Sequence, residues 1–200
     1  MAVTLHRLAL EAAERRPEGE AVRCDGVGVS WSELLSRSHG IAHALRDAGV
    51  RRGDRVAVML AKSLDVPAAF YGVYAAGGAL VPIDPKAPQS QVARILNATG
   101  ARHLITEPTR RDFVSELLPA CPEIGYVLGC EVGADPAVTM ASWSSVRERA
   151  TDNPPGANGG GLDTAYIQHT SGSTGEPKLI RHTHASARAF AEWAAEEYGL

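Results

Sequence analysis

Short apolar runs alternate with helix-like segments through the middle of this 200-residue chain, and this alternation restricts the fold more than any other feature of the sequence. Residues 55–60 form a nearly continuous apolar run of strand length, which is typical of a parallel strand covered on both faces. The same pattern predicts further strands at 79–83, 103–106 and 124–128, separated by helices at 66–76, 89–99 and 111–118. Alternating strands and helices with short Gly and Pro connections predict a doubly wound, largely parallel α/β sheet.

Smaller elements are expected before this pattern. An amphipathic helix precedes Pro17, and the turn at residues 25–26 predicts a hairpin of two short strands. Ser30, followed three residues later by Glu33, has the pattern of a capping box and predicts the start of a second helix. We expect the polar stretch 36–39 of this helix to face solvent.

The composition argues against several classes of protein. A net charge of -3 gives no basic surface for nucleic acid. The cysteines Cys24, Cys121 and Cys130 are odd in number and lack the Cys-x-x-Cys spacing, so we expect reduced thiols rather than disulfides or zinc ligands. Reduced thiols indicate a cytoplasmic protein.

Residues 66–83 contain no charged side chain over eighteen positions, which is the threshold length of a membrane-spanning helix. Pro67 and Pro82 flank this stretch, and Gly77 with Gly78 interrupts it. This punctuation favours a buried helix followed by a short strand, so we expect no membrane span.

The later part of the chain changes character. Residues 151–162 are rich in Pro, Gly and Asn and lack apolar anchors, so we expect a flexible linker or loop there. The chain is therefore divided into an α/β layer at 1–150, this linker, and a region at 163–200 that begins a second subdomain. Strands at 164–170 and 178–184 and a helix at 185–198 are expected in the last region.

Between the two expected strands, small hydroxyl side chains, glycines and one ammonium group are concentrated in nine positions. They are Thr170, Ser171, Gly172, Ser173, Thr174, Gly175 and Lys178. Glycines let backbone N–H groups converge on an anion, hydroxyls add hydrogen-bond donors, and lysine supplies a compact positive charge. This composition predicts a loop that binds a polyphosphate.

Other interpretations of this loop fit less well. The P-loop of nucleotide hydrolases requires Gly-Lys-Ser/Thr leading into a helix, whereas Gly175 is followed by Glu-Pro-Lys and a strand-like run. The spacing also differs from the Gly-x-Ser-x-Gly nucleophile elbow. A metal site of His169, His182 and His184 is conceivable, but no carboxylate supports it, so we expect no metal ligands and a structural role for His184.

The stretch at 170–178 resembles the phosphate-loop signature of the adenylate-forming enzymes, which include acyl- and aryl-CoA synthetases, luciferases and the adenylation domains of nonribosomal peptide synthetases. Residues 77–85 resemble the family's second recurring motif, and residues 30–35 with 52–54 resemble the first. Neither motif contacts substrate in the family, so both are interpreted as fold markers, with Asp84 as a turn residue.

The resemblance implies that a carboxylic acid and ATP, with Mg2+, give an acyl-adenylate and pyrophosphate. The acyl group then passes to a thiol, either the phosphopantetheine of a carrier protein or CoA. Leu179 stands where the family usually has glycine, and the other motifs point to different acids. The acid is therefore left open among amino, aryl and fatty acids.

The resemblance covers only about the first two-fifths of the family's usual length. The family's magnesium-binding Glu, its ribose-binding Asp and its catalytic lysine have no counterpart here, so the catalytic residues are unknown. We therefore expect the N-terminal part of an enzyme, inactive alone, which is either a fragment or a half that works with a complementary C-terminal polypeptide. The alternative is a non-catalytic nucleotide-binding or interaction module.

Overall fold

The computed structural model describes residues 4–130, 137–156, 159–171 and 177–199. Its elements in chain order are α1 (Leu5–Arg15), β1 (Glu20–Cys24), β2 (Val27–Ser30), α2 (Trp31–Asp47), β3 (Arg55–Met59), α3 (Asp65–Ala76), β4 (Ala79–Pro82), α4 (Gln89–Thr99), β5 (His103–Thr106), α5 (Arg111–Leu117), β6 (Tyr126–Leu128), β7 (Thr139–Ala141), α6 (Trp143–Arg147), β8 (Thr164–Ser171), β9 (Pro177–Thr183) and α7 (His184–Tyr198). Short 3-10 helices precede and follow α5, at Pro108–Arg110 and Leu118–Ala120.

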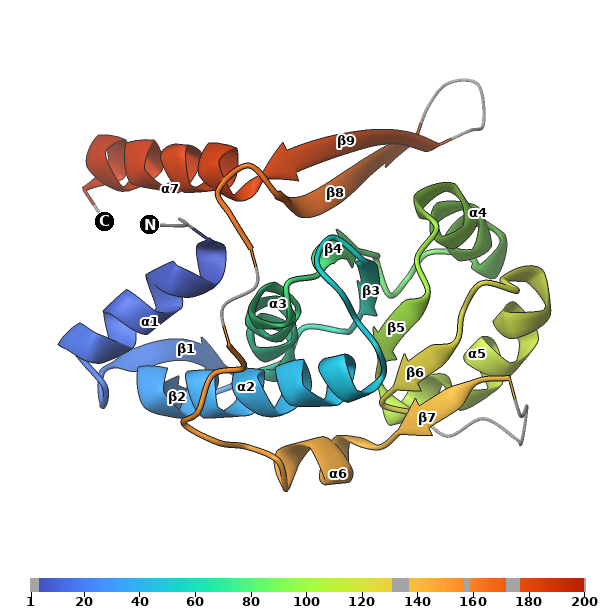
Figure 1. Ribbon diagram of the computed structural model, residues 1–200, viewed down its shortest axis with the longest axis horizontal. Coiled ribbons are helices and arrows are strands. Elements are labelled where there is room, and N and C mark those ends of the chain that lie inside the picture. The colour runs from blue at the N-terminus through green and yellow to red at the C-terminus, as the bar shows by residue number, and fades with distance from the viewer. Residues whose placement is uncertain (1–3, 131–136, 157–158, 172–176, 200) are drawn as a thin grey trace.

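A seven-stranded sheet organises the molecule, in the order β7-β6-β5-β3-β4-β8-β9 (Figure 1). Neighbouring strands are parallel from β7 through to β8, and β9 alone pairs antiparallel, with β8. β1 and β2 form a separate antiparallel hairpin. The predicted α/β fold with a largely parallel sheet is therefore confirmed.

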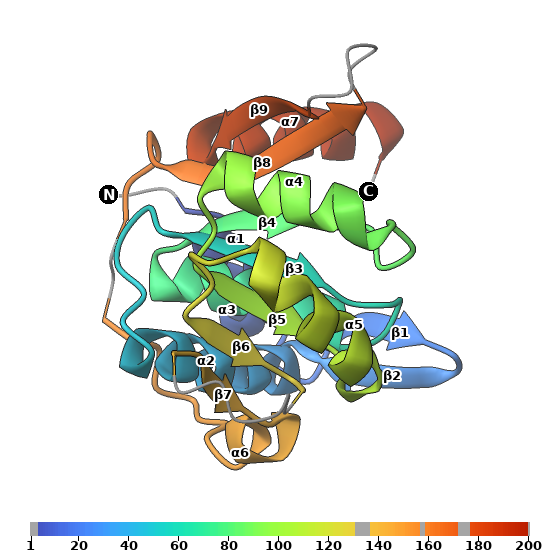
Figure 2. The ribbon, with the colours of Figure 1, turned by 90° about the vertical axis from the view of Figure 1, so that its right-hand side faces the viewer.

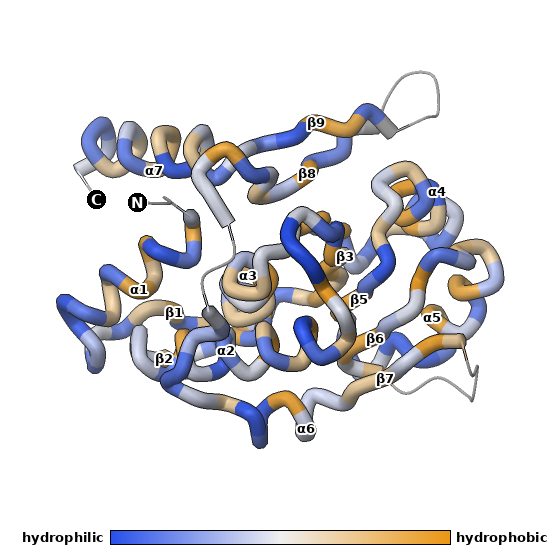
Figure 3. Tube along the Cα trace, viewed as in Figure 1, coloured by the Kyte–Doolittle hydropathy of each residue, from blue (hydrophilic) through white to orange (hydrophobic). Residues whose placement is uncertain are grey.

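The central strand β3 is buried on both faces. Val56 and Val58 belong to one core cluster, which also contains residues of α2 and α3. Ala57 and Met59 belong to a second cluster, which also contains residues of α4 and α5. Figures 1 and 2 show these two pairs of helices on opposite sides of the sheet, and in Figure 3 the hydrophobic colouring of β3 lies between them. Two-sided burial explains why the strand has a continuous apolar sequence.

The uncharged stretch 66–83 forms most of α3 and all of β4, as expected. Gly77 ends the helix with a φ of 86°, a left-handed conformation that glycine adopts without steric cost. No helix in the described ranges is long and apolar enough to cross a membrane. The three cysteines are buried free thiols.

The expectation that residues 36–39 face solvent is wrong for two of them. Ser38 and His39 are buried on α2. The Ser38 hydroxyl donates a hydrogen bond to Leu34 O at 2.7 Å, and His39 Nδ1 lies 3.0 Å from Thr151 O. The Ser38 hydroxyl and His39 Nδ1 are therefore hydrogen-bonded inside the protein, by the helix itself and by the chain that follows α6, whereas the buried His39 Nε2 has no partner among the described residues.

Two elements were not expected from the sequence. The short strand β7 forms one edge of the sheet, and α6 follows it directly. The described part of 151–162 then runs along α2, where Arg46 Nη2 donates to Gly156 O at 2.6 Å and His43 Nε2 lies 3.1 Å from Asn153 O. Whether this segment is a flexible linker between subdomains stays a prediction.

Helix α1 packs on α2 through two buried imidazole rings. His6 and His39 meet edge to face, with ring centroids 5.3 Å apart. Neither ring nitrogen of His6 has a hydrogen-bond partner in the described residues. Burial, and to a smaller extent the neighbouring His39, lowers the pKa of His6 to about 4. The folded protein therefore requires a neutral His6.

This burial predicts a pH dependence of stability. The unfolded chain binds a proton on His6 below a pH of about 6.5, whereas the folded chain binds it only near pH 4, so unfolding should become easier as the pH falls between these values. We expect the free energy of unfolding to drop by about 3 kcal/mol across this window. Urea titrations at several pH values measure it.

His6→Leu should remove this part of the pH dependence, because leucine fills similar space without titrating. Leu8→Ala, in the same helix, is the control: it should lower stability at all pH values by a similar amount. An unchanged pH slope in His6→Leu would contradict the assignment.

Gly129, which follows β6, provides a test of the close packing at the carboxyl end of the sheet. Its φ is 116°, and a Cβ atom there would lie 1.8 Å from Thr106 O. Thr106 O also accepts a hydrogen bond from Trp143 Nε1 at 2.8 Å, so it cannot move freely. We expect Gly129→Ala to cost about 3 kcal/mol or more in thermal unfolding.

Gly125, before the same strand, is the matched control, since a Cβ atom there has open space. Gly125→Ala should change stability by less than about 0.5 kcal/mol. Equal effects of the two substitutions would show that backbone conformation and close approach are not the cause.

Candidate functional site

The predicted phosphate loop lies at the end of the β8–β9 hairpin. The antiparallel register places Thr170 opposite Lys178 and ends with Ser171 opposite Pro177. Gly172, Ser173, Thr174 and Gly175 lie outside the described residues, so their role stays a prediction. The described residues at the two ends of the loop, Thr170 and Lys178, are brought together by the hairpin.

This end of the hairpin lies on the side of the sheet where the parallel strands have their carboxyl ends, which is where ligands bind in doubly wound folds. β8 runs parallel to β4, so its carboxyl end points the same way as the carboxyl ends of β3, β4 and β5. Ligand sites in open α/β sheets lie outside these ends. Figure 2 shows the hairpin extending over α4.

Thr170 and Lys178 are exposed and share one face of the hairpin, because directly opposed residues point to the same side. Lys178 forms no ion pair with any residue in the ranges 4–130, 137–156, 159–171 and 177–199. An exposed ammonium beside a hydroxyl, without a competing carboxylate among these residues, is suited to hold an anionic ligand.

The three histidines near the loop do not converge. His182 on β9 stacks on Tyr166, with ring centroids 4.5 Å apart. His169 follows Tyr166 by three residues on β8, so the alternation of strand side chains places it on the other face of the hairpin. His184 is the first residue of α7, not the last of the strand. Among the described residues no cluster of three or more metal-ligating side chains is present.

His184 instead joins three elements at the base of the hairpin. It is buried, and its Nδ1 accepts a hydrogen bond from Leu5 N at 3.2 Å. Its ring packs edge-on against Tyr74, with centroids 5.4 Å apart. Burial lowers the pKa of His184, which favours the neutral ring that this hydrogen bond requires.

Asp163, directly before β8, was not recognised as a site residue from the sequence. Its carboxylate accepts two hydrogen bonds from Arg52, from Nε and from Nη2, each at 2.7 Å. Gly160 N donates a third at 2.6 Å. The hydrogen bond from Arg52 is the main cause that lowers the pKa of Asp163. The two residues are 111 positions apart, and no local sequence signal connects them.

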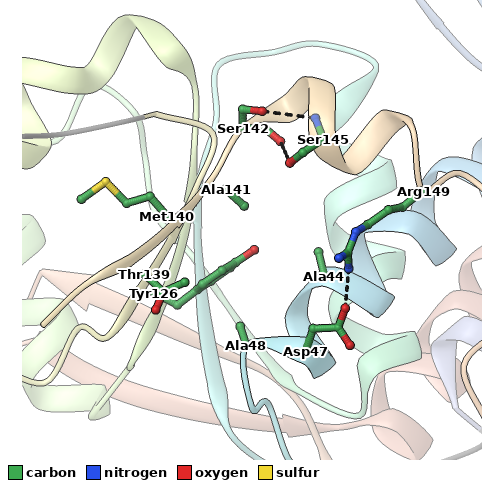
Figure 4. A pocket seen from close by; sticks show the side chains of 10 residues that line it. All are labelled: Ala44, Asp47, Ala48, Tyr126, Thr139, Met140, Ala141, Ser142, Ser145 and Arg149. Carbon is green, nitrogen blue, oxygen red and sulfur yellow. Dashed lines mark hydrogen bonds and ion pairs between the residues drawn. The ribbon is translucent and has the colours of Figure 1, made fainter. Parts of the chain in front are cut away.

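A pocket of about 430 Å³ lies beside the edge strand β7, between α2, β6, β7 and α6 (Figure 4). It is lined by Ala44, Asp47, Ala48, Tyr126, Thr139, Met140, Ala141, Ser142, Ser145 and Arg149. Arg149 pairs with Asp47, and burial raises the pKa of Tyr126 to about 12. Because β7 and β9 are opposite edges of the sheet, this pocket is separate from the hairpin site.

Comparison with known proteins assigns the family. The profile of the AMP-binding enzymes matches residues 10–199. The chain belongs to the AMP-binding enzyme family. The resemblance to adenylate-forming enzymes stated from the sequence motifs is thereby confirmed.

Relatives in this AMP-binding family include large synthetases. A plipastatin synthase component of Bacillus subtilis (strain 168) is 33% identical over 98% of this chain and 7% of that protein. The AMB antimetabolite synthetase AmbB of Pseudomonas aeruginosa is 34% identical over 97% of this chain and 14% of that protein. The solved AMPPNP-bound form of the nonribosomal peptide synthetase FmoA3 has a TM-score of 0.80 and 30% identity, over 99% of this chain and 19% of that chain.

The chain thus spans less than a fifth of the length of each of these relatives. The phosphate-binding role of residues 170–178, which the sequence motif predicts, stays a prediction. Asp84, in the second motif, forms a turn by accepting a hydrogen bond from Lys86 N at 2.8 Å, as its interpretation as a turn residue requires.

The helix that follows the hairpin carries exposed aromatic side chains. Phe190, Trp193 and Tyr198 of α7 are 66%, 50% and 68% exposed. Trp193 contacts both others, with ring centroids 5.6 Å from Phe190 and 6.3 Å from Tyr198. These side chains form a continuous aromatic surface, unlike the single exposed apolar residues that are common on proteins.

We expect the 200-residue chain to self-associate through this surface. Replacing Phe190 and Trp193 together by serine should lower the average mass measured by light scattering, because apolar area is removed from the contact. Leu162→Ser is the control, since Leu162 is 87% exposed but is not part of the aromatic surface. A strictly monomeric unmodified chain would contradict the expectation.

Proposed function

We propose that this chain supplies the ATP phosphate-binding loop of an enzyme that activates a carboxylic acid. A carboxylate oxygen of the acid attacks the α-phosphorus of ATP, the bond from that phosphorus to the β-phosphate oxygen breaks, and pyrophosphate leaves. The resulting acyl-adenylate then loses AMP when a thiolate attacks the acyl carbon. The thiol belongs to a carrier-protein phosphopantetheine or to CoA.

The chain's own residues act on the leaving pyrophosphate. Lys178 would pair with the phosphate oxygens, while Thr170, Ser171 and the loop between Gly172 and Gly175 would donate hydrogen bonds to them. Negative charge on the leaving group increases during the reaction, so donors fixed around it favour the transition state over the bound substrate.

Mg2+ would add positive charge at the same phosphates, as the family implies, but no residue of this chain is assigned as its ligand. The acid, the acceptor thiol and a complementary polypeptide carrying the rest of the enzyme are part of the proposal. A cytoplasmic location fits reduced thiols. The acid is left open among amino, aryl and fatty acids.

One observation supports this proposal above the others. In a chain of the AMP-binding family, Lys178 lies beside Thr170 on the hairpin, exposed and without an acidic partner in the described ranges, and β8 ends on the side of the sheet where doubly wound folds commonly bind ligands.

Lys178→Ala should weaken ATP binding to the chain about tenfold or more, because a charged hydrogen bond to phosphate is lost. Titration calorimetry with the non-hydrolysable analogue AMPPNP measures the dissociation constant. Lys62→Ala is the matched control, since Lys62 is an exposed lysine outside the hairpin. Equal affinity for both variants would refute the role of Lys178.

Exchange of pyrophosphate into ATP separates the enzyme from the alternative, a non-catalytic nucleotide-binding module. The enzyme should show acid-dependent exchange when a polypeptide carrying the remaining family motifs is added. Binding of AMPPNP without exchange under any such complementation would favour the module.

A further inference from the structure

We propose that Arg52 and Asp163 are positioning residues that set the orientation of the β8–β9 hairpin relative to the sheet. Their contact would thereby position Thr170 and Lys178, the described residues at the far end of the hairpin. The consequence for ATP rests on the proposed function, whereas the orientation itself does not.

Arg52 projects from a turn that is fixed to the sheet. Gly53 N donates a hydrogen bond to Gly77 O at 2.9 Å. Asp54 O accepts one from Ala79 N at 2.8 Å, at the start of β4. The turn is therefore tied to the entry of the strand next to β8, and the guanidinium of Arg52 starts from a defined place.

Asp163 lies where β8 begins and β9 ends, which we call the root of the hairpin. Its carboxylate accepts hydrogen bonds from Arg52 and, within its own turn, from Gly160 N. Its backbone oxygen accepts from His184 N at 3.1 Å, directly after β9. A second bond, from Ala185 N to Gly161 O at 2.8 Å, lies beside it. Asp163 therefore connects the beginning of β8 to the sheet through its carboxylate, and to the end of β9 through its backbone oxygen.

The backbone pairing between the hairpin and the sheet is short, although Ala165 is buried in the first core cluster and Ile167 packs against the second. In the described part of the chain, β8 pairs with β4 through the single ladder position Leu80–Tyr166. By comparison, β3 and β4 pair at four positions. Beyond Tyr166, β8 has no further described ladder position with β4, so the direction of the far half of the hairpin depends on the contacts where β8 begins and β9 ends, among them Arg52–Asp163 and the packing of Ala165 and His184.

The hairpin is long enough to amplify a small rotation. β8 has eight residues, which corresponds to a length of about 26 Å. A rotation of about 5° at the root would move the far end by about 2 Å over that length. Displacements of about 1 Å are enough to lower rates strongly when reacting groups must be aligned.

The geometry of the contact suits this role. A bidentate guanidinium–carboxylate contact fixes direction as well as distance, which a single contact does not. The Arg52 side chain is largely exposed, and exposed ion pairs contribute little to global stability. Removing it should therefore change the orientation of the hairpin more than the stability of the protein.

Distances between two spin labels test the orientation in the full 200-residue chain. One label is placed on β9 by Ile180→Cys and the other beyond α5 by Glu123→Cys, both at exposed positions. The natural cysteines are buried, and labelling of the chain without introduced cysteines measures their contribution to the signal. We expect a narrow distance distribution in the doubly labelled chain that keeps Arg52, and a distribution at least twice as wide when Arg52→Ala is added.

The control is Arg147→Ala. Arg147 pairs with Asp65 at 3.1 Å, and the exposures of the two side chains, 62% and 25%, match the 62% and 23% of Arg52 and Asp163. This pair joins α6 to α3, away from the hairpin, so its loss should leave the distance distribution unchanged. Exchanging the charges, with Arg52→Asp and Asp163→Arg together, should narrow the distribution again.

A distribution in Arg52→Ala as narrow as in Arg147→Ala would overturn the proposal. Arg52→Lys keeps the charge but loses the bidentate contact, and should give intermediate broadening. Thermal unfolding of all variants separates orientation from misfolding, since Arg52→Ala and Arg147→Ala should unfold at similar temperatures.

The consequence for function is measured separately. In the complemented pyrophosphate exchange assay, Arg52→Ala should lower kcat about tenfold and leave KM for ATP within about twofold, because alignment and not phosphate contact is lost. An unchanged kcat would overturn the link to the loop. If the unmodified chain fails to bind AMPPNP, the proposed function fails, while the distance measurements still decide the orientation.

Discussion

Burial of β3 on both faces is the constraint on which the rest of this structure depends. Neighbouring residues of the strand enter separate cores, Val56 and Val58 on one side and Ala57 and Met59 on the other. A strand buried in this way has no solvent-facing side, so helices cover both faces. Its parallel neighbours require connections that cross over the sheet, and α3 and α4 supply two of them.

The same constraint explains why so much of the fold was predictable. Apolar runs of strand length and the helices between them are local signals, and Gly77 ends α3 where a left-handed residue is needed. What local signals miss is burial that depends on distant segments. Ser38 and His39 look like surface residues within α2 but are buried. His39 is covered by His6 of α1 and by Thr151, more than a hundred positions later.

The candidate site divides in the same way. Thr170 and Lys178 could be named from the motif, and the register of the hairpin brings them together. A metal site of His169, His182 and His184 was considered from the sequence and not expected. In the structure, the alternation of strand residues separates His169 from His182, and β9 ends before His184. Arg52 and Asp163 could not be paired from sequence, because a turn arginine and an acidic residue before a strand are each commonplace and only the folded sheet brings them into contact.

The hydrogen bond from Leu5 N to His184 Nδ1 spans 179 positions and joins α1 to α7. During synthesis, α1 can pack on α2 and α3 early, but this bond waits until His184 has left the ribosome. Contacts of such long range are slow to form, because the intervening chain must first be ordered. Nascent α1 is thus completed by a helix made much later, and deletions in either helix would disturb the other.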